Sequence, residues 1–321
     1  MPASTSTSPP PSGRLHRPLV WFAASMAVFA LVSAGGILLD DRTLVGAPIW
    51  SKPFKFAVSF VPYALSLAWM LSLLPRGRRF GWWAGTVITA AAALEMVLIT
   101  LQVIRGRQSH FNQETPFDDA VFQVMGLTIV ILWLGALVIA ALLLRARFLD
   151  PATAWAVRLS SLIALAGAAL GFLMVQPTPD QLAATDPPIV GAHSVGVPDG
   201  GPSLPVTGWA ATGGDLRIAH FFGMHALQLL PLLLLVLTAL APRFPRLAIP
   251  QVRLRLVLTA SAAYAATLAL LTWQALQGEP LLHPTPTTLT TAALIAAATT
   301  AATLYSLFSV RRPPTPGASA S

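Results

Sequence analysis

The sequence predicts an all-α protein, a polytopic bundle of about eight transmembrane helices with both termini in the cytoplasm. Of its 321 residues, 55% are hydrophobic and 10% are charged, whereas a soluble domain carries about 25% charged residues. Apolar runs of about 20 residues, the length that crosses a bilayer as a helix, recur along the chain. Arginines gather in alternate connections between these runs, which predicts the orientation.

Eight apolar runs are long enough to span the membrane, and together they form one predicted transmembrane domain over residues 18–310. Because the bilayer core offers no water to backbone groups, these runs are expected to be helices that pack on one another. The last two are rich in Ala and Thr, so their apolar signal is the weakest. The predicted spans are residues 18–39, 56–74, 83–104, 120–144, 155–175, 217–241, 255–276 and 288–309.

The two ends of the chain, residues 1–17 and 311–321, are predicted to be disordered tails. Both are rich in Ser, Thr and Pro and hold too few apolar residues to fold. The first span has a second interpretation as a signal peptide cleaved after Ala34, because two arginines precede its apolar run. That run continues to Leu39, longer than a usual signal core, so we favour a retained membrane anchor.

The basic residues predict which side faces the cytoplasm. Connections rich in Lys and Arg face inward, and fourteen of the twenty basic residues lie in the tails and in the second, fourth and sixth connections. Because both termini are then on one side, the number of spans is even. The inner residues are Arg14, Arg17, Arg76, Arg78, Arg79, Arg145, Arg147, Arg158, Arg243, Arg246, Arg253, Arg255, Arg311 and Arg312.

Composition also excludes several kinds of site. The chain has no cysteine, which excludes disulfides, iron–sulfur clusters, thiolate zinc sites and cysteine nucleophiles. The net charge of +8 does not indicate a nucleic-acid partner, because the charges lie in short loops and form no basic stripe interleaved with aromatic residues.

The outer connections carry the residues that point to function, beginning with "PIWSKPFKF" at residues 48–56. Lys52 and Lys55 are the only lysines in a chain that otherwise uses arginine. A lysine is a compact point charge, so the pair could bind an anion or a carboxylate. The alternative is that both side chains extend to the lipid head groups without a specific partner.

The second outer segment is "RGRQSHFNQETPFDDAVFQVMG", residues 105–126. Thr115 followed by Pro116 predicts a helix start, and Asp118 and Asp119 suit the positive end of the helix dipole. Capping does not explain the polar residues before it, of which Arg105, His110 and Asn112 are candidate ligand-binding residues.

The third outer segment is "GGDLRIAHFFGMHALQLLPLLLL", residues 213–235, where Asp215 is a predicted N-cap. His225 lies about 7–8 Å deeper than His220 and points about 140° away from it, so the two do not form an i, i+4 metal clamp. His225 and Gln228 share one helix face. The candidate binding residues here are Asp215, Arg217, His220, His225 and Gln228.

Glu95 lies in the middle of the third span, where a charged residue costs about 2.5–3.5 kcal/mol on insertion scales. Gln102, two turns later, is on nearly the same face, and Arg105 continues that face to the outer surface. These three residues predict a polar track from the outer surface towards the bilayer centre, and intramembrane ionisable residues of this kind usually serve function.

Together, these segments predict an outward-facing polar cleft that binds or translocates a small polar solute, coupled to protonation of Glu95 or His225. A membrane-embedded zinc enzyme is an alternative, with His110, His220 and His225 as candidate metal ligands. Haem is not expected, because only His225 lies inside a span.

A structural or partner-binding role is a further alternative. The outer loop 176–214 is long, rich in Gly and Pro, and predicted to be irregular. It could cover the cleft or contact another protein, and His193 within it is expected to be solvated.

Three stretches, "WSKPFKF", "SHFNQETPFDDAVFQVMG" and "GDLRIAHFFGMHALQLLP", resemble an uncharacterised family of bacterial multi-span membrane proteins. The similarity covers roughly residues 46–235 and leaves out both tails and the last two spans. The resemblance implies a multi-pass protein of the bacterial inner membrane, surrounded by lipid, and implies no activity, cofactor or oligomeric state.

Overall fold

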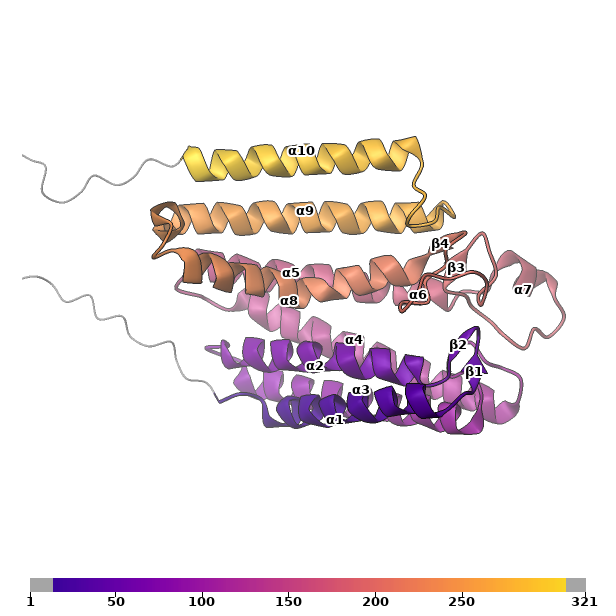
Figure 1. Ribbon diagram of the computed structural model, residues 1–321. Coiled ribbons are helices and arrows are strands. Elements are labelled where there is room, and N and C mark those ends of the chain that lie inside the picture. Colours follow the sequence, from indigo (N-terminus) through magenta and orange to yellow (C-terminus); the bar gives the residue numbers. More distant parts are fainter. Residues whose placement is uncertain (1–13, 310–321) are drawn as a thin grey trace, which may run out of the picture.

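The computed structural model describes residues 14–309, which form a helical bundle (Figure 1). Eight helices in this range are long and apolar enough to cross a membrane, as predicted. Most of residues 1–17 and all of 311–321, the predicted tails, lie outside the described residues. The eight helices are α1 (Arg17–Leu39), α2 (Ser51–Ser72), α3 (Arg78–Arg105), α4 (Pro116–Arg145), α5 (Pro151–Ala169), α8 (Leu216–Leu240), α9 (Pro250–Leu276) and α10 (Pro286–Phe308).

Each helix begins one to five residues before its predicted span. The reason is local chemistry at the N-termini. Five of the eight helices have a proline at the first or second helical position, as in Thr115-Pro116 and Asp150-Pro151, and these first turns carry little apolar signal. The fifth span also breaks at Leu170, so that a short α6 (Gly171–Met174) follows α5.

The bundle consists of two helix groups, which Figure 1 shows one above the other. In the first group α1 packs on α2 and α3 packs on α4; in the second α5 packs on α8, both contact α9, and α10 packs on α9 at the edge. The largest hydrophobic core lies mainly in the first group and extends to Val157 and Ala164 of α5 and Leu227 of α8, and a separate smaller core joins α5, α8 and α9. The groups meet mainly where α4 contacts α5 and, less extensively, where α2 contacts α8.

The most extensive helix contact joins α5 and α8 and is built from small residues. Ala156, Ser160 and Ala164 recur every four residues along one side of α5 and are buried. Gly167 continues the contact, where its backbone meets Gly223 of α8. Since lipid is as apolar as leucine, helices in a membrane associate through close backbone packing, which small residues allow.

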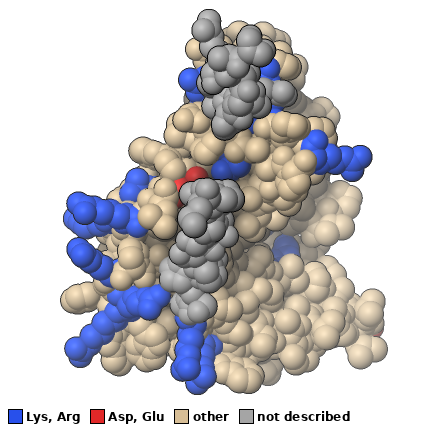
Figure 2. Space-filling model, turned by 90° about the vertical axis from the view of Figure 1, so that its left-hand side faces the viewer, with Lys and Arg blue, Asp and Glu red and all other residues tan. Residues whose placement is uncertain are grey.

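Both described ends of the chain lie at one end of the bundle (Figure 1). The turns between α2 and α3, α4 and α5, and α8 and α9 lie at the same end. Figure 2 shows that arginine side chains spread over this surface, with few acidic ones. The fold therefore gathers the arginines of the alternate connections on one surface. His16, in the predicted N-terminal tail, is ordered and buried here: it caps α1 and bonds to the carbonyl of Trp82.

The opposite end carries the longer connections. A hairpin of β1 (Thr43–Leu44) and β2 (Ala47–Pro48) joins α1 to α2. Residues 176–214 include α7 (Pro179–Ala183) and β3 (Ser194–Val195), which pairs antiparallel with β4 (Gly214–Asp215) directly before α8. The remainder is irregular, as predicted. The predicted N-caps Thr115 and Asp215 are confirmed, since each side chain accepts a bond from a backbone N–H of the first turn.

Candidate functional site

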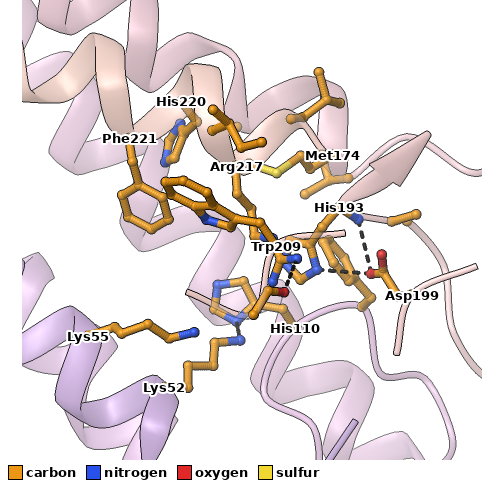
Figure 3. A pocket seen from close by; sticks show the side chains of 18 of the residues that line it. Lys52, Lys55, His110, Met174, His193, Asp199, Trp209, Arg217, His220 and Phe221 are labelled. Carbon is orange, nitrogen blue, oxygen red and sulfur yellow. Dashed lines mark hydrogen bonds and ion pairs between the residues drawn. The ribbon is translucent and has the colours of Figure 1, made fainter. Parts of the chain in front are cut away.

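A cavity of about 2240 Å³ lies between the two helix groups (Figure 3). Its walls come from α2 and α4 on one side and from α5 and α8 on the other, and the 176–214 connection covers its outer end. Along α4 the lining extends from Phe122 to Ile139, which is about 26 Å at 1.5 Å per residue. The cavity is therefore a deep slot that follows the helices, and its charged side chains other than Glu95 lie in its outer part.

Eight of the twelve candidate binding residues line this cavity. They come from three helices and one loop that are far apart in the sequence, and most lie near the outer end. They are Lys52, Lys55, Glu95, His110, Arg217, His220, His225 and Gln228.

The central group links Lys52, His110 and Glu95. The Nζ of Lys52 lies 2.9 Å from the Nδ1 of His110, and the Nε2 of His110 lies 3.7 Å from the Oε1 of Glu95. The other carboxylate oxygen of Glu95 accepts a 2.9 Å bond from the hydroxyl of Thr128. The Glu95 side chain is 0% exposed and that of His110 is 22% exposed. The group therefore runs from the cavity into the buried interior.

The geometry determines where the imidazole proton lies. An ammonium group only donates, so a charged Lys52 donates to Nδ1 of His110 and leaves the imidazole proton on Nε2. That proton points towards Oε1 of Glu95, which has no hydrogen-bond partner in the described structure. A movement of less than about 1 Å would bring the two atoms into hydrogen-bond range. The three side chains thus form a path along which a proton can move.

Burial lowers the pKa of His110 well below its usual value, and the nearby charges of Lys52 and His193 lower it further. The imidazole is surrounded by the rings of Phe56, Phe111 and Phe122. His110 is therefore neutral near pH 7, the form that can accept a proton at one nitrogen while it releases another.

The low pKa of His110 predicts acid-sensitive stability. The unfolded chain protonates this histidine below about pH 6.5, whereas the folded protein keeps it neutral, so the unfolded state binds more protons and stability falls as pH falls. The native protein is expected to lose stability as the pH falls from 6.5 to 5. His110→Gln is expected to make that loss of stability smaller by up to about 2 kcal/mol. SDS titration of the purified protein at several pH values measures it. His283→Gln, at an exposed histidine, is the control, and equal pH slopes for His110→Gln and the native protein would contradict the assignment.

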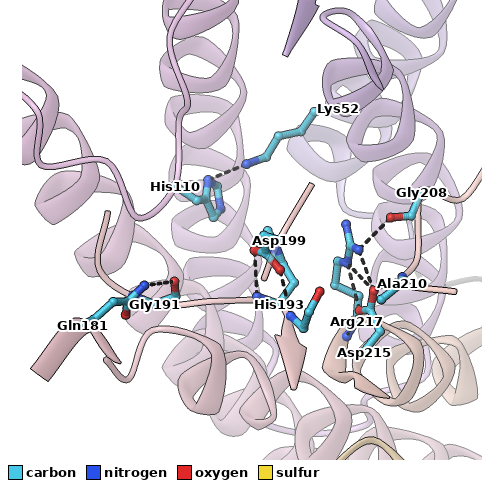
Figure 4. A network of polar contacts seen from close by, with 11 residues as sticks. Lys52, His110, Gln181, Gly191, His193, Asp199, Gly208, Ala210, Asp215 and Arg217 are labelled. Carbon is cyan, nitrogen blue, oxygen red and sulfur yellow. Dashed lines mark hydrogen bonds and ion pairs between the residues drawn. The ribbon is translucent and has the colours of Figure 1, made fainter. Parts of the chain in front are cut away.

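Lys55 and Arg217 lie beside this group and are held by the outer connection. Figure 4 shows the contacts of Arg217. The Nζ of Lys55 donates to the carbonyl oxygen of Thr207 at 3.0 Å. Arg217 forms an ion pair with the buried carboxylate of Asp215 and donates to the carbonyl oxygen of Gly208 at 2.7 Å. Asp215 lies behind Arg217, outside the cavity lining, so its role is to position Arg217 and the connection.

His193 and Asp199 form a second pair that the sequence reasoning missed. His193 was expected to be solvated, but its side chain is 24% exposed and its Nδ1 lies 2.9 Å from Oδ2 of Asp199. Burial would raise the pKa of Asp199, but hydrogen bonds from His193 and Ser194 outweigh it and hold that pKa below its usual range. Burial lowers the pKa of His193. The six-residue spacing of His193 and Asp199 in "HSVGVPD" was the available signal.

The two histidines of α8 occupy different places. The Nδ1 of His220 donates to the carbonyl oxygen of Gly167 on α5 at 2.8 Å, because a carbonyl only accepts. His225 lies deeper, with its Nδ1 3.4 Å from the Oε1 of Gln228, so the predicted shared face is present. Both line the cavity, but neither is bonded to the group around Glu95.

The polar track predicted along α3 takes a different course. Gln102 and Arg105 lie outside the cavity lining; both bond to the buried carboxylate of Asp118 and so tie α3 to the start of α4. Asn112, also outside the lining, supports its own loop through Gln108 and Glu114. The path from Glu95 to the cavity therefore passes through His110 and Lys52.

Metal ligation can be tested directly from the side chains. Within residues 14–309, no three side chains of His, Asp or Glu lie close enough together to hold a metal ion. His110 and Glu95 form one pair and His193 and Asp199 another, while His220 and His225 are separate. The ligand set that the zinc alternative needs, with His110, His220 and His225 at one point, is not formed by these residues.

In comparisons with known proteins, no family model, curated protein or solved structure matches this chain.

Proposed function

We propose that this multi-pass protein lies in the bacterial inner membrane and binds a small polar solute in the outward-facing cavity, coupled to protonation of Glu95 through His110 and Lys52. The observation that carries the proposal is that a fully buried carboxylate lines a large cavity and is connected to its polar end by an imidazole and an ammonium group. The arginine-rich end supports a cytoplasmic location for the termini, and the family resemblance supports the bacterial inner membrane.

The coupling follows from the balance of charges around Lys52. When the ammonium of Lys52 gives its proton to Nδ1 of His110 and the Nε2 proton passes to Glu95, a charged pair becomes a neutral pair. A solute bound at Lys52 changes the free energy of this proton transfer from Lys52 to Glu95. The other charged and titratable groups that act on these residues are Lys55 and Arg217 from the helices and His193 and Asp199 from the outer connection. Binding and proton position are therefore linked through one electrostatic cluster.

Glu95→Gln tests the coupling, because glutamine keeps the size and the bond to Thr128 but cannot take up the proton. Acetate, inorganic phosphate, glycine, choline or glucose is added to the purified protein in weakly buffered detergent solution. A pH indicator then measures the protons that the protein takes up or releases. At least one solute is expected to bind and to change the bound protons in the native protein, and Glu95→Gln is expected to lose most of that change.

Asp41→Asn is the control, since Asp41 is an exposed carboxylate outside the cavity lining. It is expected to retain the native proton change. The proposal fails if none of the solutes, nor the longer-chain probes described below, binds the native protein. It also fails if Glu95→Gln exchanges as many protons as the native protein.

A further inference from the structure

We propose that the bound solute is an amphiphilic anion, with an acidic head group held between Lys52 and Lys55 and an apolar chain that extends into the slot between α4 and the second helix group. This inference rests on the proposed function and specifies its ligand.

The two lysines are cations without an acidic partner. They lie three residues apart on α2, hence on one face, and both line the cavity. Neither ammonium is within ion-pair distance of a carboxylate in residues 14–309; Lys52 contacts His110 and Lys55 contacts a carbonyl oxygen. In contrast, Arg217 is paired with Asp215. Two unpaired ammonium groups at one end of a cavity favour an anionic group between them.

The lysines do not extend to the membrane surface. Both are half-buried, and Figure 3 shows their ammonium ends directed towards His110 and Arg217. A side chain that only reached for lipid head groups would instead point outwards along α2. Their position therefore favours a ligand inside the cavity.

Below these polar groups the slot is apolar. No charged side chain lines it beyond Glu95 and the level of Gln228, and the inner lining is hydrocarbon apart from the indole of Trp133, the phenol of Tyr63 and the hydroxyl of Ser161. The Ser161 hydroxyl already donates to the carbonyl oxygen of Val157 at 2.8 Å. The indole N–H of Trp133 is already bonded to the carbonyl oxygen of Leu165 at 3.1 Å. The innermost lining residues are Leu67 on α2 and Leu132, Trp133, Ala136 and Ile139 on α4.

The size of the cavity agrees with an elongated ligand. Sites for drug-sized molecules measure about 300–1000 Å³, whereas this cavity measures about 2240 Å³. A small polar solute at the lysines would leave the apolar slot in contact with water. An alkyl chain would remove that apolar surface from water, which is favourable by about 0.8 kcal/mol per methylene. The same slot offers few polar groups to a solute that is polar throughout.

The test uses the ω-bromo derivatives of hexanoate, octanoate and decanoate, whose bromine quenches tryptophan fluorescence, with the full-length protein in nanodiscs of zwitterionic lipid. Affinity is expected to rise roughly tenfold for each two methylenes added. Trp133→Phe is expected to reduce the quenching by the longest acid and not by the shortest. Equal affinity across the series would overturn the inference, and if the short acids still bind, the proposed function stands. If no acid of the series binds, the inference fails, and the proposed function fails with it only when acetate, phosphate, glycine, choline and glucose do not bind either.

The head-group site is tested with Lys52→Gln/Lys55→Gln, which is expected to weaken bromodecanoate binding at least tenfold and to leave binding of the uncharged ω-bromodecanol unchanged. Lys52→Arg/Lys55→Arg retains both charges and is expected to restore most of the affinity, which separates charge from misfolding. Arg42→Gln, at an outer charge outside the cavity lining, is the control. Equal loss of acid and alcohol binding, or no loss of either, would overturn the head-group assignment.

Two sources could supply such a molecule, the outer leaflet of the bilayer and the aqueous phase outside. Nanodiscs that contain phosphatidylglycerol distinguish them. If an anionic lipid is the ligand, phosphatidylglycerol competes with bromodecanoate, and if a free amphiphile is the ligand, it does not. Both results require the same acidic head and apolar chain.

Discussion

Gly167→Ala is expected to destabilise the bundle by about 2 kcal/mol, and Gly167→Leu by more. A Cβ atom at this position would lie 2.5 Å from the Cα of Gly223 and 2.7 Å from the backbone nitrogen of Met224. These are backbone atoms, so no side-chain rotation can relieve the overlap. The two helices must instead separate, which removes the close packing that holds them together in lipid.

Gly126→Ala on α4 is the matched control, because nothing lies within 4 Å of the added Cβ. Alanine is the better helix former by up to about 1 kcal/mol, so this variant is expected to be as stable as the native protein or slightly more stable. SDS titration followed by circular dichroism measures all three variants. Native stability of Gly167→Ala would show that α5 and α8 are not in backbone contact.

Gly167→Ala is also expected to change the cavity. His220 donates its Nδ1 proton to the carbonyl of Gly167, so separating α5 from α8 also releases a histidine of the cavity wall. Gly167→Ala, if it folds, is therefore expected to change ligand binding through the shape of the second helix group, although Gly167 itself lies outside the lining.

The sequence predicted the helices well because each span depends on local information. Length and apolar character identify a span, and a Thr-Pro or an Asp after two glycines identifies a cap, without knowledge of distant residues. The errors lie where that information is weak. The helix starts were placed up to five residues late because the first turns hold proline or charged residues, such as Pro250 of α9 and Arg78 of α3. The break at Leu170 has no sequence signature that we can name.

The site was predicted less completely because it depends on contacts between distant segments. Helical periodicity placed Glu95, Gln102 and Arg105 on one face, and this is a correct statement about a single helix. In the structure Gln102 and Arg105 instead bond to Asp118. The residue that lies beside Glu95 is His110, which comes from a loop. Asp118 had a sufficient explanation as a residue of the first helical turn, so its second role was not sought. A periodic pattern cannot say which loop residue will reach the buried carboxylate.

Asp215→Ala is expected to lower the stability of the protein by about 3 kcal/mol, because it leaves Arg217 charged and unpaired in a partly buried position. The Asp215 side chain is 0% exposed and that of Arg217 is 22% exposed. Asp215 also accepts hydrogen bonds from the backbone N–H groups of Ala210 at 2.8 Å and Arg217 at 3.0 Å. The substitution therefore removes the N-cap of α8 and releases the end of the connection that covers the cavity.

Glu114→Ala offers a comparison, because Glu114 pairs with Arg107 on the exposed surface, where the two side chains are 40% and 49% accessible. Exposed pairs contribute little to stability, so this variant is expected to unfold close to the native SDS concentration. Asp215→Ala/Arg217→Met should recover part of the lost stability, since removing both charges avoids the cost of one unpaired charge. If the double variant is less stable than Asp215→Ala by the full effect of Arg217→Met alone, the two residues are not coupled. The position of Arg217 at the cavity wall would then need another explanation than the carboxylate behind it.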